Sequence, residues 1–179
     1  AAARTLPAMG LLFVPIVLGA SSLYTWAQPE VVAADAQLQQ KAAYLNVPFF
    51  AARAVFYFAV WGLLAWRLSS WSRQQDGGAD PTRAERLRGL SAVGLVLLSL
   101  TTTFAAVDWG MSLAPHWFST LYGVLFIIGW TLSALSFTIV LMARLAGEAP
   151  FARALQPVTV HALGKLLLAF TMLWGYVNF

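Results

Sequence analysis

Long apolar stretches alternate with short polar segments along this chain. The apolar stretches run over about 6–26, 48–71, 90–109, 117–142 and 157–179. An α-helix needs about 20 apolar residues to cross the hydrocarbon core of a bilayer. Because a span in lipid must satisfy its own backbone hydrogen bonds, we expect each stretch to be helical. The pattern predicts one all-α domain over 1–179, a polytopic transmembrane helix bundle with about five spans.

Composition supports lipid as the solvent of most of the chain. Of the 179 residues, 60% are hydrophobic and only 10% are charged, whereas soluble domains are about 25% charged. The net charge of +4 is spread over the loops and forms no patch for nucleic acid. The chain starts at Ala1 without methionine and stops at Phe179 inside an apolar run. We therefore interpret it as a fragment of a longer chain.

The residue inventory also limits the cofactors. The chain has no cysteine, which excludes disulfides, thiolate-bound iron–sulfur clusters, Cys-ligated zinc and covalent haem c within it. Its two histidines, His116 and His161, are predicted on opposite sides of the membrane, so they cannot ligate one haem iron. We expect this chain itself to bind no metal and no redox cofactor.

The positions of the arginines predict an orientation. Basic residues concentrate around the 72–88 and 146–156 loops, while the 27–47 and 108–116 segments carry few. Arginine and lysine in loops favour the cytoplasmic side of a membrane. We therefore predict a bacterial inner (cytoplasmic) membrane protein with its 72–88 and 146–156 loops in the cytoplasm. The other two segments would face the periplasm or outer side.

Asp108 and His116 are the most unusual residues for their position, since titratable groups at a membrane boundary cost free energy. Asp108 ends a helix face formed mostly of small residues, including Gly94, Thr101 and Ala105. If the intervening turn folds back, Asp108 and His116 could form a proton-handling pair or hold a quinol head group. The alternative is that Asp108 caps a helix and His116 is simply solvated.

Arg53 has a structural interpretation as one partner of an ion pair. Arg53, about five residues into the second apolar stretch, is expected to pair with Asp35 or Glu30 and so clamp the 27–47 segment. We favour this structural interpretation of Arg53, Asp35 and Glu30.

His161 and Lys165 lie four residues apart in the last apolar stretch and so share a helix face. They could form a cytoplasmic proton entrance. The alternative is that Lys165 extends toward the headgroups or pairs with an acid outside this sequence.

Several blocks of the sequence resemble one family. They are 24–35, 38–50, 108–120, with its Pro-His-Trp-Phe-Ser-Thr run, and 161–170, with its Leu-Gly-Lys run. In order and spacing they resemble ActF, a membrane subunit of alternative complex III that is related to NrfD/PsrC-type subunits. By the same resemblance, family members carry a histidine where Gln28 stands and an aspartate where Ala162 stands.

The resemblance implies a subunit of a respiratory or photosynthetic quinol:electron-acceptor oxidoreductase that supports quinol oxidation, proton translocation or both. It implies partners in the same complex, namely an ActC-like sister subunit and subunits that bear haem c and iron–sulfur clusters. Quinone, quinol and lipid are the small molecules left for this chain to contact. Two alternatives stay open: a scaffold subunit with no quinone or proton site of its own, and a small-solute transporter.

Overall fold

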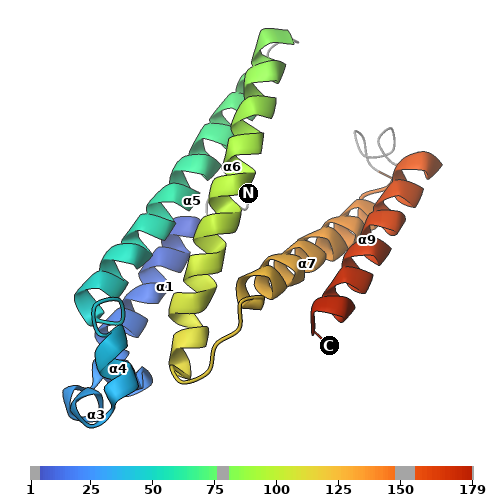
Figure 1. The fold of residues 1–179 in the computed structure, drawn as a ribbon. Coiled ribbons are helices and arrows are strands. Elements are labelled where there is room, and N and C mark those ends of the chain that lie inside the picture. Colours follow the sequence, from blue (N-terminus) through green and yellow to red (C-terminus); the bar gives the residue numbers. More distant parts are fainter. Residues whose placement is uncertain (1–4, 76–80, 148–155, 179) are drawn as a thin grey trace. The chain divides into compact units, whose positions relative to one another are not determined.

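The computed structural model describes residues 5–75, 81–147 and 156–178, with side chains over the same ranges except 74–75 and 81–84. The chain divides into two compact units, Ala1–Ser119 and Thr120–Phe179. Every regular element in the described ranges is a helix (Figure 1). The first unit contains α1 (Leu6–Leu18), α2 (Ala20–Leu23), η2 (Thr25–Ala27), α3 (Pro29–Ala34), α4 (Ala36–Lys41), α5 (Val47–Gln75), α6 (Pro81–Trp109) and η3 (Met111–Leu113). The second contains α7 (Tyr122–Arg144) and α9 (Pro157–Asn178).

The all-α, multi-pass prediction is confirmed. Four helical segments in the described residues are long and apolar enough to cross a membrane: Val47–Arg73, Glu85–Leu113, Tyr122–Arg144 and Pro157–Asn178. The predicted ends need correction. Helices α5 and α6 extend to Gln75 and from Pro81, so most of the predicted 72–88 loop is helical. Residues 76–80 lie outside the described residues. The fourth span begins at Tyr122 rather than at 117, because the chain around Pro115 is a turn.

The predicted first span over 6–26 is wrong in its length. Helix α1 has 13 residues, which is about 20 Å of helix. Pro15 sits inside it, and the N–H of Gly19 donates to the Pro15 carbonyl oxygen at 2.9 Å. The chain resumes as the four-residue α2 and then becomes extended at Tyr24. The hydropathy of the stretch is continuous, but its helix is not.

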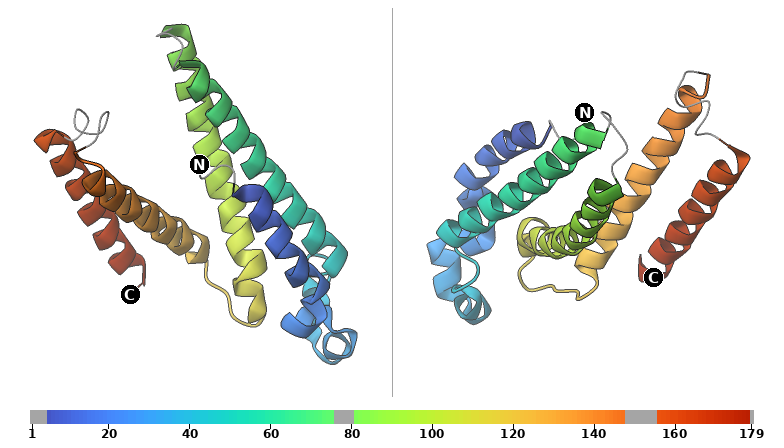
Figure 2. Two further views of the ribbon diagram at one scale, coloured as in Figure 1. Left: turned by 180° about the vertical axis from the view of Figure 1, so that it is seen from behind. Right: turned by 90° about the horizontal axis from the view of Figure 1, so that it is seen from above.

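In the first unit, α5 lies beside both α6 and α1 (Figure 2). The small-residue face predicted on α6 makes the contact with α5. Gly94, Thr101, Ala105 and Asp108 are buried, and a Cβ added at Gly94 would lie 3.3 Å from a methyl group of Leu64 on α5. Leu98, the bulky residue of that face, is 42% exposed. The close approach of the two helices therefore depends on the small residues of this face.

The main hydrophobic cluster lies where the 19–46 segment meets the helices. It contains Ala20, Tyr24, Trp26, Leu38 and Phe50, each at most 4% exposed. The Tyr24 ring is 4.9 Å from that of Trp26 and 5.3 Å from that of Phe50, centroid to centroid. The Tyr24 hydroxyl donates to the Trp109 carbonyl oxygen at 3.2 Å, which ties the segment to the end of α6.

The 19–46 segment includes two short α-helices after η2. It contains α3 and α4, which are separated at Asp35, an extended residue. The Asp35 carboxylate accepts hydrogen bonds from the backbone N–H groups of Gln37 (2.9 Å) and Leu38 (3.3 Å). Asp35 is thus a helix N-cap, a role in which aspartate is strongly preferred.

The second unit is a helix pair. Helices α7 and α9 pack side by side, and Ile128 and Gly123 are the buried residues of α7. In the most apolar part of each helix, only 6% of the residues of α7 and 0% of those of α9 are buried. Large side chains such as Phe137 and Tyr176 are exposed, and these faces suit contact with lipid or with other helices.

Candidate functional site

Asp108 is the centre of a buried polar cluster between α5 and α6. Its side chain is 1% exposed and pairs with the 10% exposed side chain of Arg53. The Arg53 Nε–H donates to Asp108 Oδ2 at 2.8 Å, and Nη2 donates to Oδ1 at 3.1 Å. The Tyr57 hydroxyl also donates to Oδ2, at 2.7 Å. A bidentate arginine with a third donor satisfies most of the hydrogen-bonding capacity of a buried carboxylate.

The other side of Arg53 is equally well packed. Its guanidinium carbon lies 3.8 Å from the ring centroid of Tyr44 and 4.3 Å from that of Phe49. Its Nη1–H donates to the Tyr44 carbonyl oxygen at 3.0 Å. Arg53 therefore links the loop before α5 to the end of α6, with its charge compensated by Asp108 and its planar faces on aromatic rings.

Two pairings expected from the sequence are corrected by this geometry. Arg53 pairs with Asp108, and not with Asp35 or Glu30. Asp35 caps α4, and Glu30 lies in the first turn of α3. Asp108 and His116 do not form a pair either, because Asp108 is enclosed by Arg53 and Tyr57. Asp108 also caps no helix with its carboxylate, which is buried in the ion pair.

His116 instead pairs with Asp35. Its Nε2 lies 2.9 Å from Asp35 Oδ2, and its Nδ1 lies 2.9 Å from Gln37 Oε1. The His116 side chain is 60% exposed and that of Asp35 is 24% exposed. The acid and the histidine that meet thus come from α4 and from the chain after η3. Asp35 orients the imidazole while its other oxygen holds the start of α4.

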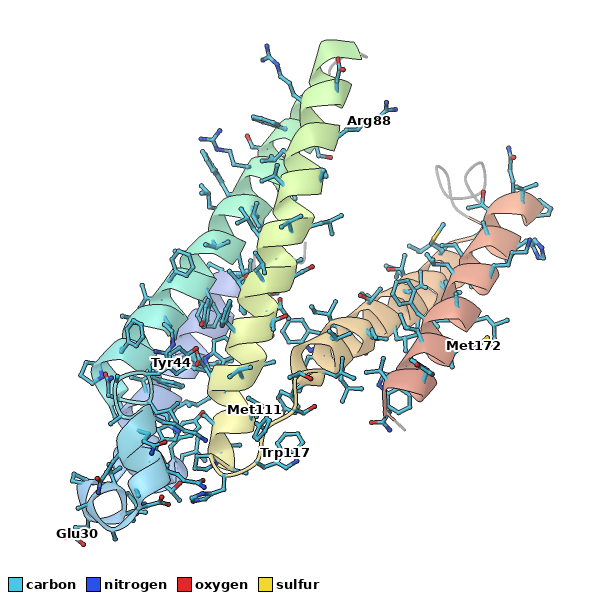
Figure 3. All side chains as sticks on the ribbon, viewed as in Figure 1. Glu30, Tyr44, Arg88, Met111, Trp117 and Met172 are labelled. Carbon is cyan, nitrogen blue, oxygen red and sulfur yellow. The ribbon has the colours of Figure 1, made fainter. Side chains whose placement is uncertain are left out.

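A groove of about 680 Å³ lies next to this pair. Its lining combines apolar and aromatic side chains with polar ones. The apolar and aromatic residues include Tyr44, Leu45, Met111, Trp117 and Phe118, and the polar ones are Gln37, Gln40, Lys41, Ser112 and His116. Figure 3 labels Tyr44, Met111 and Trp117. Trp117 and Phe118 are 52% and 75% exposed. The groove therefore combines an apolar, aromatic lining with one oriented imidazole, which suits a flat, weakly polar ring.

Two further contacts hold the groove together. Lys41 Nζ donates a hydrogen bond to the Pro115 carbonyl oxygen, and Ser112 Oγ donates to the Asp108 carbonyl oxygen. The first joins α4 to the turn before His116. The second joins η3 to the end of α6. Both walls of the groove are thus anchored to the Arg53–Asp108 cluster or to the element that carries it.

The surroundings of Tyr44 alter the pKa of its phenol. Burial of the phenol, followed by the nearby charge of Asp108, raises the pKa of Tyr44 from 10.0 to about 12. A phenolate beside the Asp108 carboxylate would place two negative charges close together. Tyr44 is therefore a neutral hydrogen-bonding group at physiological pH.

The residues proposed for a cytoplasmic proton path lie elsewhere. His161 and Lys165 are exposed on α9, in the second unit. Within the described ranges, neither side chain makes a hydrogen bond or ion pair. The same part of the chain contains no group of three or more His, Cys, Asp or Glu side chains that could hold a metal ion.

Sequence reasoning missed three members of the site: Tyr57, Tyr44 and Gln37. A signal for Tyr57 was present, because it follows Arg53 by four residues and so lies on the same face of α5. The positions of Arg53 and Asp108 along their spans were a second signal. Arg53 is near the start of its span and Asp108 near the end of the next, so an antiparallel pair of helices places them at one level.

Known proteins give no further identification. Neither a family model nor a curated protein sequence matches this chain.

Proposed function

We propose that this chain is a membrane subunit of a quinol:electron-acceptor oxidoreductase of the alternative complex III type, similar to ActF. We further propose that the groove beside His116 receives the quinol head group. The observation that carries the proposal is the His116–Asp35 pair at the edge of an aromatic groove. The sequence blocks that resemble ActF support it independently, since two of them contain these residues.

The chemistry would use the two nitrogens of His116 differently. Asp35 accepts the Nε2–H and holds the ring, which leaves Nδ1 for a substrate. A quinol hydroxyl would replace Gln37 Oε1 at Nδ1 and, in the tautomer that carries its proton on Nε2, donate to Nδ1. Oxidation of the quinol to quinone releases two electrons and two protons. His116 would take one proton and pass it to water through its exposed edge, and the second proton would leave directly to water at the open side of the groove.

The electrons would leave for centres in other subunits, which we propose to bear haem c and iron–sulfur clusters beside an ActC-like sister subunit. In this proposal, the groove faces the periplasmic or outer side, and the protons are released there. The Arg53–Asp108–Tyr57 cluster would act as a positioning group, because it fixes the end of α6 against Tyr44, one wall of the groove.

The test is turnover of the complete complex in membrane vesicles with a soluble quinol analogue. We expect His116→Gln to lower kcat/KM by about a hundredfold, a typical loss for a general base. Glu30→Gln is the matched control, because Glu30 lies in the same segment but does not line the groove. A blue native gel would establish that both complexes assemble. Normal turnover of an assembled His116→Gln complex would contradict the proposal that quinol binds beside His116.

A scaffold role is the second candidate, and the second unit favours it. Almost no residue in the most apolar parts of α7 and α9 is buried. Their exposed side chains offer a large surface for neighbouring helices. In that case, substitutions on these faces would reduce assembly, whereas His116→Gln would leave turnover unchanged.

A further inference from the structure

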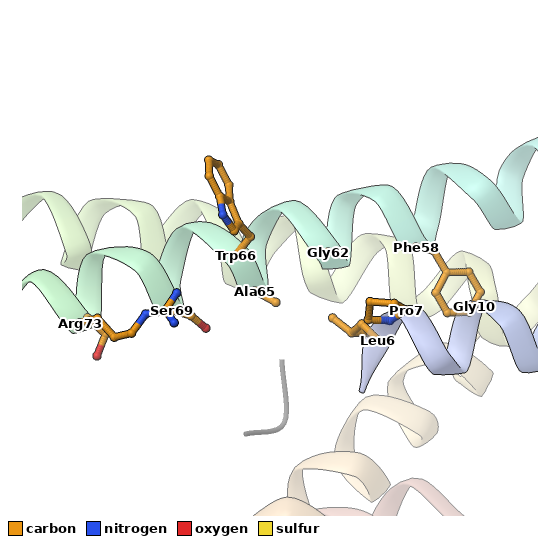
Figure 4. Close-up of a pocket in the computed structure, with 10 residues that line it drawn as sticks. Leu6, Pro7, Gly10, Phe58, Gly62, Ala65, Trp66, Ser69 and Arg73 are labelled. Atoms are coloured by element: carbon orange, nitrogen blue, oxygen red, sulfur yellow. The ribbon is translucent and has the colours of Figure 1, made fainter. Parts of the chain in front are cut away.

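A separate groove lies along α1 and α5, away from the His116 region. Its volume is about 1110 Å³. Figure 4 shows Leu6, Pro7 and Gly10 of α1 on one side and the residues from Phe58 to Arg73 of α5 on the other. None of the residues discussed for quinol chemistry lines it.

The groove changes in character along its length. Near Phe58, Gly62 and Ala65 its lining is apolar, while toward the end of α5 it is lined by Ser69, Ser72 and Arg73. Arg73 is an exposed cation in the last turn of α5. The guanidinium of Arg73 favours an anion there, although the C-terminal end of the helix dipole by itself favours a cation. An occupant that fits must therefore be apolar at one end and negatively charged at the other.

The length of the groove fits one leaflet of a bilayer. Arg73 follows Phe58 by 15 residues, which is about 22 Å of helix. Half of the hydrocarbon core measures about 15 Å, and the headgroup region lies beyond it. If Arg73 is level with the phosphates, the apolar end of the groove reaches to the depth where an acyl chain ends.

Gly62 is what leaves the middle of the groove open. A Cβ built at Gly62 would meet no atom within 4 Å. Glycine costs a helix interior about 1 kcal/mol relative to alanine, and no neighbouring group requires its small size. The space above it is continuous with the groove, so a bulky side chain at this position would occupy the groove without displacing a packed neighbour.

We propose that this groove is a binding site for one anionic phospholipid, with an acyl chain along Gly62 and the phosphate at Arg73. The charge gradient along a single span distinguishes such an amphiphile from an apolar helix of a partner, which would leave Arg73 without a counter-charge. The site would fix the lipid against α1, the short helix that α5 supports.

The experiment reconstitutes the full chain in vesicles of equal phosphatidylglycerol and phosphatidylcholine, extracts it in mild detergent and counts retained lipids by native mass spectrometry. We expect retention of phosphatidylglycerol over phosphatidylcholine by about fivefold, the preference that one arginine at a membrane surface supports. Gly62→Leu should lose most of the retained lipid. The matched control is Gly89→Leu on α6, which also has open space at its Cβ and should retain it.

A second pair of variants tests the headgroup. Arg73→Gln should keep a bound lipid but lose the preference for phosphatidylglycerol, whereas Arg88→Gln, an exposed arginine of α6 outside the groove, should keep it. Equal lipid retention by wild type and Gly62→Leu would overturn the proposal. So would a photoreactive residue at position 69 that cross-links to polypeptide instead of lipid.

Discussion

Arg53 and Asp108 form a bidentate ion pair between α5 and α6, although 55 residues separate them in the chain. Both are largely shielded from solvent. A charge in such a position is tolerated because its partner and further donors replace the water that it loses. The pair therefore fixes the register of α5 and α6 at one end. Each buried charge is tolerated only while the opposite charge is present.

Neutralising one partner should destabilise the first unit. Asp108→Asn leaves the Arg53 guanidinium buried without a counter-charge, and we expect a loss of about 3–5 kcal/mol in the free energy of unfolding. Thermal unfolding in detergent micelles, followed by tryptophan fluorescence, would measure it. The double variant Arg53→Gln/Asp108→Asn should lose less than the sum of the single variants. Strictly additive losses would contradict a direct interaction.

Asp35 has two roles that substitution can separate. Asp35→Asn keeps an oxygen for the N–H groups of Gln37 and Leu38 but removes the charge opposite His116. Asp35→Ala removes both, so it should destabilise α4 by about 1 kcal/mol more, the usual value of an N-cap. Hydrogen exchange of the amides of 36–41 would show the difference. Equal exchange in the two variants would mean that the cap contributes nothing.

Tyr44 predicts a loss of stability at alkaline pH. Its pKa is raised to about 12 in the folded chain, so above about pH 10 the unfolded chain loses the phenol proton while the folded chain keeps it. Stability from this group is present below pH 10 and falls as the pH rises toward 12. We expect Tyr44→Phe, which keeps a ring beneath Arg53, to show a shallower decline in melting temperature between pH 9 and pH 11. Parallel declines would refute the assignment.

Gly94 should tolerate enlargement poorly. A Cβ there already lies 3.3 Å from a methyl group of Leu64, so Gly94→Leu must displace the Leu64 side chain or the helix α5 that carries it. We expect a destabilisation of about 1–3 kcal/mol, as for other overpacked sites. Gly89→Leu on the same helix has open space and serves as the comparison in the same unfolding assay. Similar melting temperatures for both variants would show that the contact is not tight.

The fold was predictable where hydropathy and helix length agree. The spans over 48–71 and 157–179 match α5 and α9 to within a few residues at each end, because lipid allows few alternatives to a helix. Helix α6 ends at the predicted position but begins at Pro81, well before the predicted 90. The first apolar stretch failed this test. Pro15 and Gly19 interrupt the helix, and hydropathy does not register such an interruption because both residues are compatible with an apolar run.

The site was only partly predictable. Asp108 and His116 were singled out from the sequence, but the pairing considered between them is not the one that the structure contains. Closeness in sequence favoured pairing them with each other. The structure pairs each with a residue more than 50 positions away, because partner choice depends on how α5 and α4 dock on α6. A single sequence does not contain that information, although the shared depth of Arg53 and Asp108 pointed to it.

The hydrophobic cluster of Ala20, Tyr24, Trp26, Leu38 and Phe50 has a consequence for how the protein is degraded in a cell. Lipid tails provide no hydrophobic driving force between helices, so we expect release of water to contribute most to the packing of this cluster. It is also where we expect the chain to unfold first. Loss of this packing would expose the rings of Tyr24, Trp26 and Phe50 while the long helices stay formed, and proteases and chaperones could then recognise the exposed aromatic surface.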